Sequence, residues 1–316
     1  MPTGTDTDTM RVCEVTAFGG PDVLRESSRP WPVAAPHEVV VTIAAATVNP
    51  SDIAARSGAH RARLPELQPP FVPGWDLAGV VTDVGAQTSG FTVGDPVLGM
   101  IPWIRISGRV GSYAQAAAVQ PDWLAPRPDG LDEVTGATIP LNALTARQAL
   151  DLIGGPPGST LLVTGASGAV GGFAMQLAAQ AGLRVLAVAS PGDEEWVSGL
   201  GAIEVLPRDV DFAALAPVDA LLDAVPIGAR AAAAVRSGGV AVFTRRVGEI
   251  DPANGLRIET PLAHSDPDAL AELARMAADG RLRTRVARTL DLADGAEAHR
   301  LVEHGGVRGK VVLTTT

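Results

Sequence analysis

A turn of small residues near the middle of the chain has the spacing that lets a backbone bind a phosphate group. It reads Ala166-x-Gly168-x-x-Gly171 and lies between an apolar run at residues 161–163 and an Ala/Leu-rich segment of helical character. N–H groups at the start of such a helix point at an anion, and the missing side chains let a pyrophosphate come close. A turn that only packs a helix on a strand is the alternative, but the order strand, turn, helix favours binding. We therefore expect a dinucleotide to contact seven successive residues: Gly165, Ala166, Ser167, Gly168, Ala169, Val170 and Gly171.

The end of the next expected strand bears on which dinucleotide would bind. An NAD site usually carries an acidic residue about 20 positions beyond the first glycine, where it binds the ribose 2′-hydroxyl. Here Ala189 and Ser190 occupy that place, and Ser190 suits a 2′-phosphate. The following run Pro191-Gly-Asp-Glu-Glu195 would repel a phosphate unless it faces away, and Arg208 is the nearest compensating cation. The run is equally well explained as the solvated start of a helix. NADPH is thus favoured, and NADH is not excluded.

Composition and charge exclude several classes of protein. The chain has 316 residues, 46% of them hydrophobic and 19% charged, as expected for a globular protein of one or two domains. Its net charge of −10 argues against a nucleic-acid surface. The single cysteine, Cys13, permits neither an internal disulfide nor a thiolate metal cage. No apolar stretch is long enough to span a bilayer, and residues 1–9 lack a signal-peptide core and are expected to be a disordered tail. We expect a cytoplasmic protein with no nucleic-acid or membrane partner.

The secondary structure predicted around the glycine-rich turn differs between the first third of the chain and the rest. The first third alternates strand-forming runs, such as residues 39–43 and 79–84, with connectors rich in Pro and Gly. From about Asp132 onward helical and strand patterns alternate, which predicts a parallel sheet with helices on both faces. The strands expected after the turn are residues 184–189, 219–223, 239–243 and 310–314, and the helices are residues 194–200 and 229–235.

Two further helices are predicted near the C-terminus by their end signals. The first begins at the N-cap Asp266, followed by Pro267, and ends before Gly280. The second begins with Asp294 and Glu297, whose spacing resembles a capping box.

Short segments in a fixed order accompany the turn along nearly the whole chain. They are Asn49-Pro-Ser-Asp52, Arg56-Ser-Gly58, Pro73-Gly-Trp-Asp-Leu-Ala-Gly79, Val84-Gly85, Gly94-Asp95, Val97-Leu-Gly99, Gly111-Ser-Tyr-Ala114, Leu144-Thr-Ala146, Ala298-His-Arg-Leu301 and Gly309-Lys-Val-Val-Leu313. In this order and spacing, from about Met10 to Leu313, the chain resembles the zinc-independent medium-chain dehydrogenases/reductases of the quinone oxidoreductase and enoyl reductase type.

The resemblance implies an α/β protein in which a Rossmann, doubly wound parallel sheet is inserted in a GroES-like, β-rich catalytic domain. The catalytic domain would comprise residues 1–126 plus 266–316, and the Rossmann domain residues 127–265. The nicotinamide would lie in the cleft between them, and two chains would join through edge strands of the cofactor domains as a homodimer. Further cofactor contacts implied in this way are Thr145, Val225, Phe243 and Lys310.

The resemblance also bears on metal catalysis. In zinc-dependent relatives the ligands fall at the positions of Asn49 and of Trp75 with Asp76, and together with Cys13 these form no His/Cys constellation. No zinc or other metal is expected. Hydride transfer without a metal needs an acceptor that can hold negative charge, which fits a quinone or a C=C bond conjugated to a carbonyl. We therefore expect an NADPH-dependent, metal-free oxidoreductase acting on such small molecules.

Two polar residues are candidates for catalysis. By resemblance Asn49 contacts the nicotinamide or the substrate; alternatively it is a turn residue before Pro50. After the Arg-x-Gly segment the family commonly has a tyrosine that is the proposed proton donor, whereas this chain has Ala59-His60. A histidine can donate a proton near neutral pH, so His60 either replaces the phenol or is an exposed loop residue.

Three larger side chains are candidates for the substrate pocket. Trp75 and Trp103 could wall a flat aromatic site, although packing is the favoured explanation for Trp75. Arg245 could bind an anionic group of the substrate or lie at the rim, and the rim is favoured. Two other functions remain open at this level: non-redox chemistry on a bound cofactor, as in an isomerase or cyclase of secondary metabolism, and a non-catalytic binding role.

Overall fold

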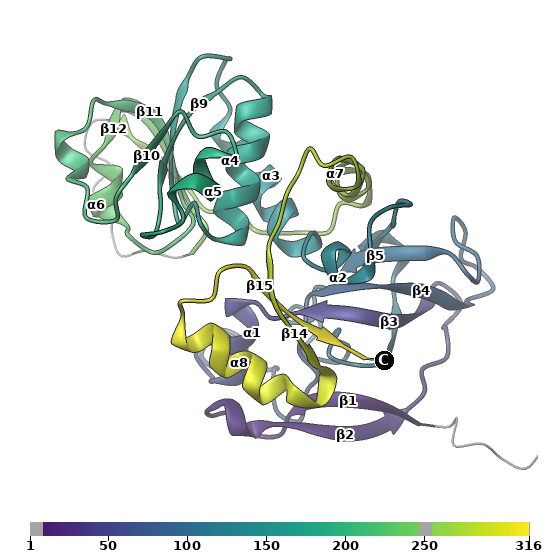
Figure 1. The fold of residues 1–316 in the computed structure, drawn as a ribbon. Helices are drawn as coiled ribbons and strands as arrows, with labels where there is room; N and C mark the ends of the chain where they lie inside the picture. The colour runs from purple at the N-terminus through teal and green to yellow at the C-terminus, as the bar shows by residue number, and fades with distance from the viewer. Residues whose placement is uncertain (1–8, 246, 248–254, 316) are drawn as a thin grey trace, which may run out of the picture. The chain divides into compact units, whose positions relative to one another are not determined.

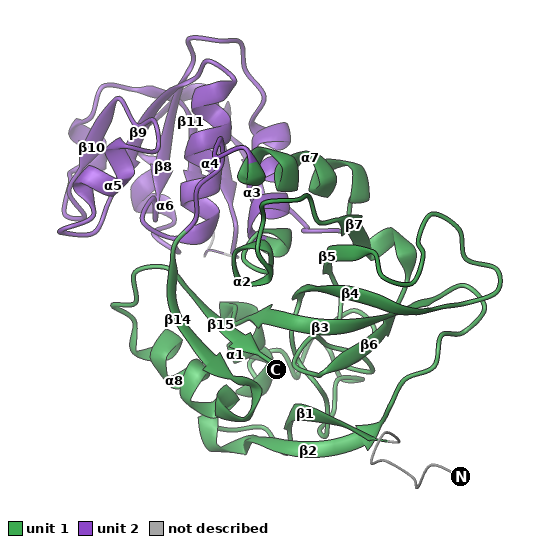
Figure 2. Ribbon diagram, turned by 45° about the vertical axis from the view of Figure 1, so that its right-hand side comes forward, with its two compact units in different colours: residues 1–141, 265–278, 285–316 green, residues 142–264, 279–284 purple. Residues whose placement is uncertain are grey.

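The computed structural model describes residues 9–245, 247 and 255–315. The chain divides into two compact units, of which the first comprises residues 1–141, 265–278 and 285–316 and the second residues 142–264 and 279–284 (Figure 2). The expected tail at residues 1–9 lies outside the described residues except for Thr9, which begins a strand. None of the described helices is long and apolar enough to cross a membrane.

The first unit is built on a mixed sheet (Figure 1). Its strands follow the order β14-β15-β3-β4-β5-β7, with β6 paired to β3, and only the pair β14 and β15 is parallel. A separate antiparallel ribbon is formed by β1 and β2. The strands are β1 (Thr9–Val15), β2 (Leu24–Pro30), β3 (Val39–Thr47), β4 (Asp76–Val84), β5 (Pro96–Met100), β6 (Ala116–Val119), β7 (Leu124–Pro126), β14 (Val286–Asp291) and β15 (Lys310–Thr314).

β3 is the strand on which the rest of this sheet is assembled, because it pairs with β4, β6 and β15. Its β-branched residues fill the core, and Val39, Val41 and Ile43 are fully buried. β4 lies beside β3 as its antiparallel neighbour, so closely that a Cβ at Gly79 would lie 2.0 Å from the carbonyl oxygen of Thr42. Glycine is therefore required at this position of β4. β3 itself continues beyond the expected residues 39–43 and ends at Thr47.

Four helices belong wholly to the first unit, and their ends test the expected caps. They are α1 (Pro50–Arg56), α2 (Glu133–Gly136), α7 (Pro267–Ala278) and α8 (Gly295–His304). The cap at Asp266 is confirmed, because its Oδ1 accepts the Ala269 N–H at 3.0 Å. The capping box at Asp294 is wrong, since that side chain caps no backbone N–H. α8 follows directly on a 3₁₀ turn, which holds Asp294 out of the extended conformation that a capping residue adopts.

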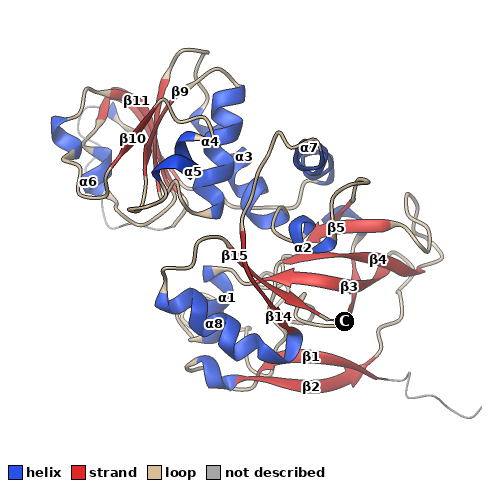
Figure 3. Ribbon diagram, viewed as in Figure 1, coloured by secondary structure: helices blue, strands red, loops and turns tan. Residues whose placement is uncertain are grey.

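The second unit is a parallel sheet of six strands in the order β10-β9-β8-β11-β12-β13. From β8 the strand order runs outward through β9 and β10 on one side and through β11, β12 and β13 on the other, as in doubly wound dinucleotide-binding sheets, so the predicted fold class is confirmed. Helices connect β8 to β9, β9 to β10 and β11 to β12 (Figure 3). The elements are α3 (Pro140–Ile153, starting in the first unit), β8 (Thr160–Thr164), α4 (Ala169–Gln180), β9 (Arg184–Val188), α5 (Glu194–Ser198), β10 (Glu204–Leu206), β11 (Val218–Asp223), α6 (Ala229–Ala232), β12 (Val235–Phe243) and β13 (Arg257–Glu259).

The first break between the units falls after Leu141, whereas the sequence placed it after Pro126. Residues 127–141 stay with the first unit because α2 contacts β3 and β4. The Arg127 N–H also donates to the Pro96 carbonyl at 2.9 Å. The switch from strand-rich to helical sequence near Asp132 marks the start of α2 and not a change of unit.

Two adjacent glycines at the start of α4 differ in the space around them. A Cβ at Gly171 would lie 2.4 Å from the Gly165 carbonyl oxygen, whereas one at Gly172 would meet nothing nearer than Leu200 Cδ1 at 3.5 Å. We expect Gly171→Ala to lower the free energy of unfolding by about 2 kcal/mol, because the turn must move away from the helix. Gly172→Ala should be neutral or stabilise by up to about 1 kcal/mol, since alanine is the better helix former. Urea denaturation of both variants measures this, and equal values would contradict it.

Candidate functional site

The amide of Asn49 is the centre of a buried polar cluster in the first unit. Asn49 follows β3 and is the N-cap residue of α1. Its Nδ2 donates to Asp76 Oδ2 at 2.7 Å, and its Oδ1 accepts from Lys310 Nζ at 2.6 Å. All three side chains are buried. Asn49 therefore bridges an ammonium and a carboxylate that come from opposite ends of the sequence.

Asp76 and Lys310 are both held by further hydrogen bonds. Asp76 Oδ2 accepts from Thr47 Oγ1 at 2.6 Å, and its Oδ1 accepts from the Leu141 N–H at 2.6 Å. Lys310 Nζ also donates to the Val48 carbonyl at 2.9 Å. Burial raises the pKa of Asp76 and lowers the pKa of Lys310, while the attraction between the two groups opposes both shifts. The cluster is thus formed where β3 ends and where β4 and β15 begin.

A second buried carboxylate, Asp52, supports the same residues from α1. Its Oδ2 accepts from the Asn49 N–H at 2.9 Å, and its Oδ1 accepts from Trp103 Nε1 at 3.0 Å. Burial raises the pKa of Asp52 to about 7, helped by the charge of Asp76 and opposed by the Asn49 hydrogen bond and by Lys310. Trp103 itself is fully buried and stacked on Phe71, with 5.5 Å between ring centroids. Its indole therefore lies in the core of the unit and not on the wall of an open pocket.

A buried pair that sequence reasoning missed lies beside Asp52. The Tyr113 hydroxyl and His299 Nε2 are 3.1 Å apart, although they are separated by 186 residues along the chain. Burial, with Arg56 nearby, lowers the pKa of His299 to about 3, so its imidazole is neutral. Burial and the charge of Asp52 raise the pKa of Tyr113 well above its usual value. Both residues belong to segments that carried the family resemblance, and this was the only signal of their pairing.

Trp75 and His60 are both close in sequence to this cluster, but neither bonds to it. Trp75 is 7% exposed, and its Nε1 is among the buried nitrogens that have no hydrogen-bond partner in the described part of the chain. His60 is half-buried in the turn after α1, where its carbonyl accepts the N–H groups of Arg63 and Leu64 at 2.9 Å. Burial and the charge of Arg63 lower the pKa of His60. Both effects favour the neutral imidazole.

The glycine-rich turn of the second unit has the geometry of an anion site. Gly165 has φ +65°, a conformation that favours glycine, and Val225 packs against it. Gly168 is the N-cap of α4 and supplies no capping side chain, so the first amides of this 12-residue helix lack a side-chain acceptor. Ser167 Oγ accepts the Ser190 N–H at 3.1 Å, which ties the turn to the end of β9.

The residues expected at the far end of the dinucleotide follow neighbouring strands. Leu206 of β10 pairs with Val188 of β9, so Arg208 and Ser190 both follow the same edge of the sheet. Arg208 is exposed. Glu194 and Glu195 are exposed in the first turn of α5, as expected for a solvated helix start.

The other expected contacts of the second unit have different environments. Thr145 is buried on α3, and Val225 is 40% exposed. Phe243 is 1% exposed in the core of the sheet, which leaves only its backbone to contact a cofactor. Arg245 is exposed two residues after β12, in keeping with a rim position.

Comparison with known proteins identifies the family. The Alcohol dehydrogenase GroES-like domain matches residues 35–129, and the Zinc-binding dehydrogenase family matches residues 200–313. The chain is 32% identical over 314 residues to a 2-methylene-furan-3-one reductase of Solanum lycopersicum, covering 96% of this chain and 79% of that protein. The chain belongs to the medium-chain dehydrogenase/reductase superfamily. It is 38% identical over 188 residues to a quinone oxidoreductase of Mus musculus, covering 59% of this chain and 54% of the mouse protein. The quinone oxidoreductase structure from Coxiella burnetii superposes with a TM-score of 0.89 at 27% identity, covering 98% and 100% of the two chains.

These relatives make the chain an oxidoreductase of the superfamily. They do not favour the alternatives of an isomerase or cyclase, or of a non-catalytic binding protein. The predicted resemblance to quinone oxidoreductases and enone reductases is confirmed.

The residues at the positions of zinc ligands in other superfamily members do not fit a zinc ion. The Asn49 amide is bonded to Asp76 and Lys310, and the indole of Trp75 is not a metal ligand. Cys13 is buried in β1, where burial and Glu26 raise the pKa of its thiol to about 12. Among the residues that the structure describes, no group of three or more His, Cys, Asp or Glu side chains could hold a metal ion.

The titration of Asp52 should be measurable as a pH-dependent stability. Its pKa is 3.8 when unperturbed and about 7 when folded, so the folded chain keeps a proton that the unfolded chain loses between these values. The stabilisation is complete at low pH and is lost as the pH rises to 7. Asp52→Asn cannot ionise, so its free energy of unfolding relative to wild type should rise by on the order of 3 kcal/mol between about pH 4 and pH 8.

Chemical denaturation across this pH range measures the difference. The exposed Asp122→Asn is the matched control and should follow the wild type. A constant offset between Asp52→Asn and wild type at all pH values would show that Asp52 is ionised in the folded chain.

Proposed function

We propose that this chain is an NADPH-dependent, metal-free oxidoreductase that reduces quinones or α,β-unsaturated carbonyl compounds. The observation that carries the proposal is the turn at Gly165, Gly168 and Gly171, which leads into a helix without a capping side chain. It is supported by the buried polar cluster around the Asn49 amide, at a position where zinc-dependent relatives have a metal ligand. The names of the relatives support the substrate class, since they include a furanone reductase, quinone oxidoreductases and an NADPH-dependent alkenal/one oxidoreductase.

The cofactor is proposed to bind along the carboxyl edge of the second unit's sheet. Its pyrophosphate lies over residues 165–171 at the start of α4, where backbone N–H groups can donate to it. Ser190 and Arg208 hold the 2′-phosphate, because they follow two paired strands at the same edge. Glu194 and Glu195 are exposed and oppose this choice only weakly, since water screens them.

Asn49 and Lys310 are proposed to position the nicotinamide end. An ammonium has three N–H groups, and Lys310 uses two of them on Val48 and Asn49, which leaves one for a cofactor or acceptor oxygen. NADPH, when bound, supplies the hydride. The positive charge of Lys310 favours the negative charge that develops on the acceptor oxygen, as in other sites where donors are held in place before the reaction. Asp76 fixes the orientation of the Asn49 amide, because it accepts from Asn49 Nδ2 and so leaves Asn49 Oδ1 to accept from Lys310.

The proposal includes a cytoplasmic homodimer. β13 is an edge strand of the second sheet among the described strands, so its outer backbone groups can pair with another chain. Ile258 on this strand is 37% exposed, and Leu262 just after it is 76% exposed. Joining two such edges would cover these side chains.

The assay that tests the proposal separates cofactor binding from reduction. NADPH should raise the melting temperature of the purified chain more than NADH does, because only NADPH carries the phosphate for Arg208 and Ser190. Loss of NADPH absorbance should follow on adding members of a panel of quinones and cyclic enones. Stabilisation without oxidation by any acceptor would contradict the reductase assignment. No stabilisation by either dinucleotide would contradict the cofactor assignment.

The role of His60 is tested by His60→Phe. If the imidazole is the proton donor, turnover with an enone should fall at least about tenfold, the lower range of general-acid contributions. The wild-type rate should then fall as the pH rises through the lowered pKa of this group, because the donating cation is lost. The matched control His37→Phe replaces an exposed histidine and should leave turnover unchanged. A pH-independent rate, equal in wild type and His60→Phe, would remove His60 from the reaction.

A further inference from the structure

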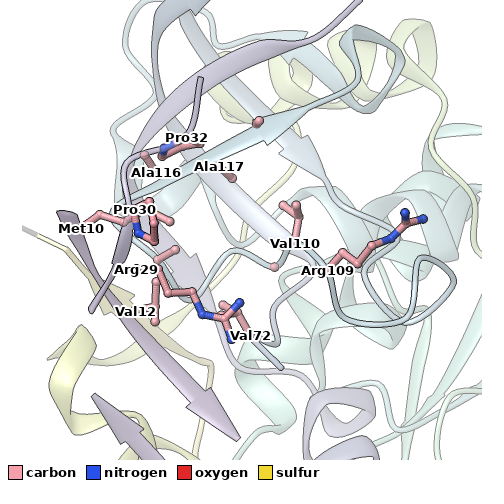
Figure 4. A pocket seen from close by; sticks show the side chains of 13 residues that line it. Met10, Val12, Arg29, Pro30, Pro32, Val72, Arg109, Val110, Ala116 and Ala117 are labelled. Atoms are coloured by element: carbon pink, nitrogen blue, oxygen red, sulfur yellow. The ribbon is translucent and has the colours of Figure 1, made fainter. Parts of the chain in front are cut away.

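A cavity of about 220 Å³ lies in the first unit, between the β1–β2 ribbon and β6 (Figure 4). None of the residues of the Asn49 cluster lines it. The ribbon joins the neighbouring segment through a bridge between Val12 and Ala114, and the cavity lies beside this junction. It is therefore a separate feature from the proposed redox site.

The walls of the cavity are apolar. Val12, Val72, Ala116 and Ala117 are buried and contribute to the lining. The alanines of β6 leave the space that larger side chains would fill. A site of this composition binds an apolar body, and its volume equals about seven water molecules' share of the liquid. This volume fits a chain of about six to eight carbon atoms.

The charged groups of the lining are both cations. Arg29 and Arg109 contribute to it, and no Asp or Glu does. Arg29 pairs with Glu14 through Nη2 at 2.5 Å and Nε at 3.1 Å, which leaves its Nη1 unused among the described contacts. Arg109 donates from Nε to the Ile106 carbonyl at 3.2 Å and forms no ion pair in the described part of the chain. In Figure 4 the Arg29 side chain lies among the lining residues, while Arg109 extends away from them.

We propose that this cavity binds a small monocarboxylate with an unbranched apolar body of about six to eight carbons. The body lies against Val12, Val72 and the β6 alanines, and the carboxylate is held by Arg29 Nη1. Arg109 adds positive potential at the mouth. The occupant would contact residues 109–111, which lead to Tyr113. The Tyr113 N–H donates to the Pro73 carbonyl at 3.0 Å.

The test uses the full chain with octanoate as the probe, in titration calorimetry. Octanoate should bind with one-to-one stoichiometry, and shortening it to hexanoate and butanoate should weaken binding about three- to fourfold per methylene group. Octan-1-ol, which has the same chain without the charge, should bind at least about fivefold more weakly. No saturable binding of octanoate, or equal binding of the alcohol, would overturn the proposal.

Variants locate the site. Val110 is a half-buried lining residue, so Val110→Trp should abolish octanoate binding, while Val93→Trp makes the same change at an exposed valine outside the lining and should not. The double variant Arg29→Gln with Arg109→Gln should lose the preference for octanoate over octan-1-ol. Unchanged binding in Val110→Trp would place the ligand elsewhere and overturn the proposal.

A measurement on the unaltered chain guards against a variant that fails to fold. Met10 lines the cavity and is one of five methionines. With methyl-labelled methionine, octanoate should shift the Met10 methyl resonance and leave the other four unchanged. Shifts of all five, or of none, would contradict binding at this cavity. These readouts need neither cofactor nor turnover, so they are independent of the proposed reductase activity.

Discussion

The hydrogen bonds of a single amide, that of Asn49, allow two opposite charges to remain buried in the first unit. An isolated buried ion costs several kcal/mol, and a buried pair is tolerated only when its remaining donors and acceptors are satisfied. Asn49 offers an acceptor to Lys310 and a donor to Asp76, which lie on strands from the two ends of this unit's sequence. Val48, Thr47 and the Leu141 N–H supply further hydrogen bonds to the two charged groups. The amide thus links the start of β15 to the start of β4 beside the end of β3.

The same burial bears on the charge that the cluster holds. Two carboxylates and one ammonium would leave a net negative charge in a dry interior. Burial raises the pKa of Asp52 to about 7, so around and below neutral pH Asp52 tends to be protonated and the charges of Asp76 and Lys310 balance. Asp52 nevertheless accepts from the Asn49 N–H and from Trp103 Nε1, which fixes the start of α1 and removes Trp103 from any open pocket. The position of the Asn49 amide and the neutrality of the cluster are therefore both consequences of burying these charged groups.

How much of this was readable from the sequence depends on the range of each interaction. The strand, turn and helix around Gly165 to Gly171 are contiguous, and the alternation of helix and strand patterns around them predicted the parallel sheet that the structure confirms. The cap at Asp266 is also local and was predicted correctly. The capping box at Asp294 failed because the preceding 3₁₀ turn sets the backbone there. The contact of Tyr113 with His299 spans 186 residues, and Lys310 meets Asn49 across 261, so no pattern of spacing could reveal either pair. Family resemblance marked these residues without saying what they touch.

The choice between NADPH and NADH also depends on residues that are distant from one another in the sequence. In the sequence Ser190 favours NADPH, the carboxylates after it oppose that choice, and Arg208 is the nearest compensating cation. The parallel pairing of β9 and β10 supports the role of Arg208, because Leu206 lies opposite Val188 and the residues after both strands therefore follow the same edge of the sheet. Arg208 reaches this edge from β10, although it lies 18 positions beyond Ser190 in the chain. The first turn of α5 is itself a favourable place for Glu194 and Glu195, since the helix dipole stabilises negative charge there. Arg208 therefore lies at this edge as a cation that the neighbouring strand supplies, and the acidic run lies at the start of α5.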